Sequence, residues 1–255
     1  NDVVGIWQSS FMLLFVICSF ALIWMHFAIR RAEHKEWFQG KTVTDLPEMV
    51  SEDAFVLDDW RPENQQFWQN TGKKIATRNL WISIPNLFLG FAVWSIWSIM
   101  VVKMPQLGFT YSSNQLFWLA ALPALSGATL RIFYGFMIPI FGGRRWTALS
   151  TASLLLPCLW MGVALQNTET SYLVMLVLAL LCGLGGGNFS SSMANISFFY
   201  PKVEKGAALG LNAGLGNLGV SGMQLIAPLM ISFSVFGNVA GEPLQLLGAD
   251  GTSQF

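Results

Sequence analysis

Acidic residues are scarce in this chain outside one short stretch. The sequence has 14 Asp and Glu residues, and nine of them lie between Glu33 and Glu63. Charged residues make up 11% of the chain and hydrophobic residues 53%, and the mean hydropathy is +0.51. This composition excludes an ordinary soluble domain and is typical of a membrane protein with one polar segment.

Cysteine and histidine, on which many metal and catalytic sites depend, are also few. The three cysteines lie in apolar runs without CxxC spacing, and both histidines, His26 and His34, belong to the first apolar run and its exit. The sequence therefore predicts no haem, metal or Ser/His/Asp site. A GxGxxG pattern at 214–219 lacks a preceding strand and a following acidic residue, so it is not a nucleotide site. We expect no enzyme activity, no cofactor and no nucleic-acid partner.

Six apolar segments are each long enough to cross a lipid bilayer, which takes about 20 helical residues. None shows the alternation of a β-strand, so the sequence predicts an all-α membrane protein. Basic residues follow the first segment, precede the second, join the third to the fourth and join the fifth to the sixth, so that all four clusters fall on one side. By the positive-inside rule that side is cytoplasmic. The predicted spans are 8–29, 79–102, 115–140, 146–166, 171–199 and 206–236.

The spans divide the chain into four parts. One helix precedes a polar segment, and five closely spaced helices follow it. The predicted parts are a membrane helix at 1–30, a cytoplasmic linker at 31–78, a five-helix block at 79–236 and an extracytoplasmic loop at 237–255.

Arg131 is the one charged side chain deep inside a predicted span. A cation at the centre of a membrane helix costs roughly 2.5 to 3.5 kcal/mol on insertion scales, so it needs a counter-ion, a cavity or a passing anion. The other spans offer no Asp or Glu as a partner. Gly127 and Gly135, one turn to either side, leave room for an object beside the guanidinium. The alternative is a structural arginine that caps carbonyl groups of a neighbouring helix.

Glycines recur in the fifth and sixth predicted spans. Gly206, Gly210 and Gly214 repeat every four residues, a pattern that favours close helix packing in membranes. Asn217 shares their face, and an amide at membrane depth needs a partner in another helix or in a ligand. Two interpretations of Asn217 stay open, substrate binding and a bond between helices. Phe189, among the glycines of the fifth span, either faces a cavity or packs against lipid or core.

Several long, ordered motifs closely resemble the NarK-type nitrate/nitrite transporters of the major facilitator superfamily. The resemblance covers about 58–236 and implies that the five-helix block is the first five helices of a twelve-helix carrier, so that the fold is a partial major facilitator fold. The motifs are Asp59–Glu63 (DWRPE), Ile75–Pro85 (IATRNLWISIP), Ser126–Arg131 (SGATLR), Ile138–Trp146 (IPIFGGRRW), Asn188–Phe199 (NFSSSMANISFF) and Ala208–Asn217 (ALGLNAGLGN).

The resemblance also implies roles for individual residues. Arg131 would bind the substrate anion, Phe189 would stack on it and Asn217 would donate a hydrogen bond to it. Phe91 and Ala213 are expected to line the same site, although Ala213 stands where relatives have glycine, so the backbone approach to the anion would differ. A second arginine would belong to the missing C-terminal half of the carrier.

The implied function is transport of nitrate and nitrite by alternating access across the bacterial cytoplasmic (inner) membrane. No carboxylate or histidine of the five-helix block lies in a span, which favours anion exchange over proton symport. Two alternatives remain, a proton-coupled symporter of another solute and a non-transporting membrane subunit. The outward-to-inward direction of 1–30 favours the last helix of a preceding carrier in a tandem fusion, of which this chain would be a fragment.

Overall fold

The computed structural model describes residues 60–232, 246–247 and 253–254, with side chains of the last long helix described as far as residue 229. The predicted span at 8–29, most of the predicted linker and most of the predicted loop at 237–255 lie outside this part. The helices are α2 (Gln65–Phe67), α3 (Lys73–Lys103), α4 (Ser113–Phe141), α5 (Gly143–Ser153), α6 (Leu155–Ala164), α7 (Tyr172–Cys182), α8 (Leu184–Phe199) and α9 (Lys202–Ser232). A π-helical turn (Trp68–Gly72), a 3-10 turn (Met104–Leu107) and two short paired strands, β1 (Leu246–Leu247) and β2 (Ser253–Gln254), complete the list.

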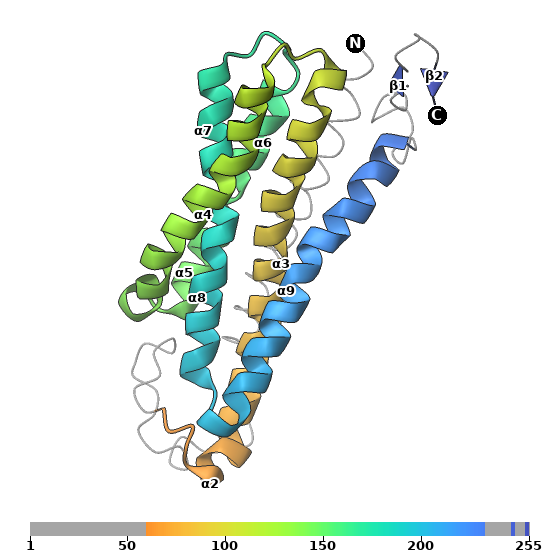
Figure 1. The fold of residues 1–255 in the computed structure, drawn as a ribbon. Helices are drawn as coiled ribbons and strands as arrows, with labels where there is room; N and C mark the ends of the chain where they lie inside the picture. The colour runs from red at the N-terminus through yellow and green to blue at the C-terminus, as the bar shows by residue number, and fades with distance from the viewer. Residues whose placement is uncertain (1–59, 233–245, 248–252, 255) are drawn as a thin grey trace.

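The helices run up and down in one bundle (Figure 1), which confirms the predicted all-α membrane fold. Four of them are long and apolar enough to cross a membrane, counting α5–α6 and α7–α8 as one helix each: Gln65–Leu107, Ser113–Phe141, Gly143–Ala164 and Tyr172–Phe199. These correspond to predicted spans two to five. Helix α9 has 31 residues and overlaps the sixth predicted span over 206–232, although it is not among these four.

The first described helix begins earlier than the sequence analysis placed it. Helical structure starts at Gln65 and continues to Leu107, whereas the predicted span began at residue 79 and 31–78 was assigned to the linker. Asn64 fixes the start, because its side chain accepts a hydrogen bond of 3.0 Å from the backbone nitrogen of Phe67. The residues that follow are too polar to show an apolar stripe, so the sequence pattern did not predict this helix.

Glycine and serine set the turns between the next helices. Gly108 has φ +93°, a left-handed conformation that ends the 3-10 turn, and Ser112 then caps α4. The Ser112 side chain accepts from the Gln115 backbone while the Gln115 side chain accepts from the Ser112 backbone, a reciprocal capping box. Gly142, with φ +78°, turns the chain from α4 into α5.

Two apolar clusters hold the bundle together. The larger one lies in the upper half of Figure 1, between α3, α4, α6 and α7, where the fully buried indole of Trp97 donates a 2.8 Å hydrogen bond to the carbonyl of Leu119. The smaller one lies at the lower end, where Trp68 and the start of α3 meet Tyr200 and the start of α9. Together they fix α3 as the central helix, against which α8 and α9 pack.

Glycines make the closest helix crossings, but not the ones that the four-residue repeat predicted. A Cβ at Gly185 of α8 would lie 2.2 Å from the carbonyl oxygen of Gly90 on α3, and one at Gly219 of α9 would lie 2.1 Å from that of Phe88. By contrast, a Cβ at Gly206, Gly210 or Gly214 would meet no described atom within 4 Å. The expectation that this repeat packs tightly is therefore wrong for the described part of the chain, where α9 uses a different face against α3.

Candidate functional site

Arg131 lies in the middle of α4, held against α8. Its Nε donates a 3.1 Å hydrogen bond to the carbonyl oxygen of Gly186. The approach is close because Gly127, one turn earlier, faces Gly183 and Gly186 without a side chain, and Gly135, one turn later, faces Ser190. The small residues on either side of Arg131 therefore admit helix α8, where the sequence analysis had expected space for a ligand.

The guanidinium also faces an aromatic ring. Its Cζ lies 5.0 Å from the centroid of the Phe189 ring, within the range of a cation–π interaction. The Phe189 ring in turn meets Phe91 of α3 edge to face, with centroids 6.0 Å apart. Arg131 and Phe189 are each partly exposed, whereas Phe91 is only 3% exposed. Three of the five predicted site residues thus meet, from three different helices.

Asn217 and Ala213 form a separate pair on α9. The Asn217 side chain donates a 2.9 Å hydrogen bond to the carbonyl of Ala213, one turn earlier on the same helix. Asn217 is exposed, on the same side of α9 as Gly210 and Gly214, as the spacing predicted. Among the described residues no hydrogen bond or ring contact joins this pair to Arg131, Phe189 or Phe91. The bond between helices that was one interpretation of Asn217 is not present in this part of the chain.

The charges around Arg131 leave it without a described counter-ion. Residues 60–232 contain three carboxylates, Glu63, Glu169 and Glu204, and all three lie at or beyond the ends of the long helices. Glu204 pairs with Lys73 at 3.3 Å, where α9 and α3 begin. Of the five N–H donors of Arg131, the described residues use one, the Nε–H that bonds to Gly186. The four Nη–H donors remain available to an oxyanion.

Asn188 is a further polar residue beside this group. It is fully buried in α8, next to Phe189, and neither its Nδ2 nor its Oδ1 has a hydrogen-bond partner in the described structure. Its Nδ2 lies near Gly90, 3.5 Å from where a Cβ would stand. A buried amide without partners costs about 1 to 3 kcal/mol for each unsatisfied group, so this position calls for a reason other than stability.

A network of polar side chains in the lower half of the bundle was missed by the sequence analysis. The Asn195 amide donates to Asn79 at 3.0 Å and to Ser83 at 3.3 Å, joining α8 to α3. Thr151 of α5 donates to the side chain of Asn86, also on α3. The available signal was an amide within an apolar helix. Asn195 is 2% exposed, so its amide needs partners of this kind.

Among the described residues no group of three His, Cys, Asp or Glu side chains could hold a metal ion. The helices define a multi-pass membrane protein whose central bundle carries one cation at membrane depth. The chain belongs to the Major Facilitator Superfamily, whose family profile matches residues 2–219.

Within that family the chain is similar to nitrate/nitrite transporters. It is 56% identical to the nitrate/nitrite transporter NarU of Escherichia coli (strain K12) over 191 residues, which are 74% of this chain and 41% of that protein. It is 58% identical to NarU of Salmonella typhimurium over 71% of this chain and 39% of that protein. A probable nitrate/nitrite antiporter, NarK2 of Thermus thermophilus, is 46% identical over 78% of this chain and 44% of its own length. The chain thus spans about two fifths of the length of these relatives.

Proposed function

We propose that the carrier containing this chain moves nitrate and nitrite across a membrane by alternating access, with Arg131 binding the anion. The observation that carries the proposal is the hydrogen bonding and missing counter-ion of the Arg131 guanidinium among the described residues. Its Nε is held by the Gly186 carbonyl, its Nη groups have no described partner and no carboxylate pairs with it. Two parallel N–H groups match the oxygen spacing of a planar oxyanion. The names of the relatives support nitrate and nitrite as that anion.

The other predicted residues take roles around the anion. Phe189 and Phe91 form an aromatic wall on the α3–α8 side of Arg131. Asn217, on the exposed side of α9, donates its amide to the anion when the second half of the carrier closes over the site, and Ala213 lies one turn away from it. This role requires the Asn217 amide to leave the carbonyl of Ala213. That bond is worth only about 1 kcal/mol, so a charged ligand displaces it.

The distribution of titratable groups favours exchange of one anion for another. A proton-coupled symporter normally carries a carboxylate or histidine at membrane depth. In residues 60–232 there is no histidine, and the three carboxylates lie at helix ends or between helices. This distribution argues against the proton-coupled alternative. The pairing of an uncompensated arginine with glycine-mediated helix crossings argues against a non-transporting subunit.

The basic clusters support an orientation for the carrier. We place it in the bacterial cytoplasmic membrane, with 31–78 and the start of α9 on the cytoplasmic side. The helices from α3 to α9 then form one block of the carrier.

Nitrate uptake into proteoliposomes tests the proposal. We expect Arg131→Lys in the full-length carrier to weaken nitrate binding about 10- to 100-fold, because a lysine offers one nitrogen where the arginine fork offers two, and a hydrogen bond to a charged group contributes about 1.5 to 3 kcal/mol. Arg145→Lys, the same substitution at an exposed arginine of α5, is the matched control and should leave uptake unchanged. Unaltered uptake by the Arg131→Lys carrier would reject the site.

A second measurement separates exchange from symport. Vesicles preloaded with nitrite should take up labelled nitrate faster than empty vesicles, with no acceleration by an inward proton gradient. Acceleration by the proton gradient in empty vesicles would favour the symporter instead.

A further inference from the structure

Ser190 of α8 is partly exposed, and its hydroxyl makes no hydrogen bond to a described residue. A serine or threonine within a helix can donate to a carbonyl three or four residues earlier on the same helix. Thr129 of α4 bonds in this way to Leu125 at 2.9 Å, and Ser191, the next residue of α8, bonds to Asn188 at 3.3 Å. The Ser190 Oγ instead faces α4, where a Cβ at Gly135 would lie 3.0 Å from it. The Ser190 hydroxyl is therefore available to a ligand.

Ser190 and Arg131 meet at one carbonyl group. In an α-helix each backbone N–H bonds to the carbonyl four residues earlier, so within α8 the N–H of Ser190 bonds to Gly186. The same Gly186 oxygen accepts the 3.1 Å hydrogen bond from the Arg131 Nε. Two donors that share one acceptor lie within about 6 Å of each other. The Ser190 hydroxyl is thus beside the guanidinium, and it follows Phe189, whose ring centroid is 5.0 Å from the Arg131 Cζ.

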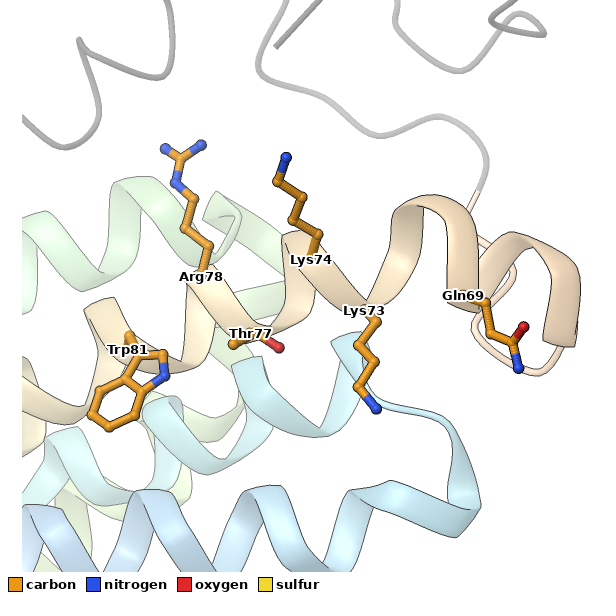
Figure 2. A pocket seen from close by; sticks show the side chains of 6 residues that line it. All are labelled: Gln69, Lys73, Lys74, Thr77, Arg78 and Trp81. Atoms are coloured by element: carbon orange, nitrogen blue, oxygen red, sulfur yellow. The ribbon is translucent and has the colours of Figure 1, made fainter.

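A second group of cations, on the surface of the first described helix, is already engaged. It surrounds a hollow of about 500 Å³, whose lining residues are Gln69, Lys73, Lys74, Thr77, Arg78 and Trp81. Figure 2 shows that Lys74 and Arg78 extend to one side of the helix, whereas the Trp81 indole lies on the other. Lys73 is paired with Glu204 at 3.3 Å, and Lys74 and Arg78 also have interaction partners. This hollow therefore does not gather unused donors around one point, as Arg131 and Ser190 do.

Nitrate and nitrite differ in the number of oxygens that need a donor. The fork of Arg131 can bond to two oxygens of a planar oxyanion. Nitrite has two oxygens, so the fork is sufficient for it, whereas nitrate has a third that needs a donor from another residue. We propose that Ser190 donates its hydroxyl to this third oxygen and so makes the carrier bind nitrate more tightly than nitrite. The inference rests on the proposed function, in which Arg131 binds the anion.

Calorimetric binding of nitrate and of nitrite to the detergent-purified full-length carrier tests this role. We expect Ser190→Ala to raise the Kd for nitrate about 10-fold and the Kd for nitrite less than about twofold, because only the nitrate complex loses a hydrogen bond to a charged ligand. Ser191→Ala is the matched control. It removes the hydroxyl of the next residue, which is 2% exposed and bonded within its own helix, and should leave both Kd values unchanged.

The ratio of the two Kd values distinguishes selectivity from a folding defect, because a partly unfolded carrier loses both anions alike. Equal loss of nitrate and nitrite in Ser190→Ala, no loss of either, or the same change of ratio in Ser191→Ala would overturn the proposal. Arg131→Lys separates this inference from the proposed function and should weaken both anions. If it weakens neither, the Arg131 site is rejected together with the role of Ser190. If it weakens both while Ser190→Ala leaves the ratio unchanged, the role of Ser190 alone is rejected.

Discussion

The glycines of α8 and α9 differ in what surrounds them, and that difference predicts opposite effects of the same substitution. In Gly185→Ala the new Cβ would stand 2.2 Å from the Gly90 carbonyl oxygen, which belongs to the backbone of α3 and cannot rotate away. Helices α3 and α8 must separate by about 1 Å to restore ordinary contact distances. In Gly206→Ala the Cβ meets no described atom within 4 Å.

The magnitudes follow from two opposing contributions. Overpacking a close-packed contact costs about 1 to 3 kcal/mol, whereas replacing glycine by alanine within a helix gains up to about 1 kcal/mol. For Gly185→Ala the net loss should be about 1 to 2 kcal/mol. For Gly206→Ala the helix gain remains unopposed, and stability should stay level or rise by up to about 1 kcal/mol.

Thermal unfolding of the purified carrier in detergent measures the stability change in both variants. A loss of about 1 to 2 kcal/mol should lower the Tm of the full-length carrier by a few degrees, and Gly206→Ala should cause no decrease. Equal Tm values for the two variants would refute the reasoning, because they would mean that α3 and α8 do not cross at Gly90 and Gly185. A loss confined to Gly206→Ala would show that another part of the carrier packs on that face of α9.

Two further predictions concern polar side chains. Asn188→Leu should leave Tm unchanged or raise it, because it removes a buried amide that has no described partner, and a loss of stability in the same thermal assay would show that the amide has one. Glu204→Ala should cost about 1 to 3 kcal/mol, because it leaves the buried Trp68 indole N–H, now 2.7 Å from the Glu204 carboxylate, without an acceptor. Glu204→Gln keeps an acceptor for Trp68 and loses only the exposed ion pair with Lys73, so its cost should stay below about 1 kcal/mol in urea or thermal unfolding, and equal losses in the two variants would contradict this assignment.

The glycines also show how far the sequence determines the fold. Span lengths, apolar composition and basic loops were enough to predict spans two to five, because burial in lipid constrains every residue of a span in the same way. The four-residue repeat of Gly206, Gly210 and Gly214 predicted packing, yet Gly216 and Gly219 make the contact with α3. Which face of a glycine-rich helix meets a neighbour depends on the crossing angle and on the side chains that the facing helix presents. Composition does not contain that information.

The start of the helix at Gln65–Leu107 shows a second reason why part of the fold could not be predicted from the sequence. Residues 65–78 are helical although they carry no apolar stripe, because their stability comes from contacts distant in sequence. Trp68 packs against Tyr200 and bonds to Glu204, more than 130 residues away. The Asn64 cap is seen in the structure, and a cap alone does not establish a helix without the tertiary contacts that stabilise it.

Arg131 brings together two interpretations that the sequence presented as alternatives. A structural arginine would cap a carbonyl of a neighbouring helix, and a binding arginine would face an anion. The guanidinium has room for both, because Nε points along one edge of the fork toward the Gly186 carbonyl and leaves the two Nη groups on the other edge. The bond to Gly186 fixes the orientation of the fork before a ligand arrives, which reduces the entropy lost on binding.

A lysine at position 131 could keep the bond to the carbonyl or reach the anion, but a single nitrogen cannot present a rigid pair of donors while it is held by α8. For this reason Arg131→Lys should leave the α4–α8 contact and the Tm nearly unchanged while it weakens nitrate binding. A purely structural arginine would not separate the two measurements in this way.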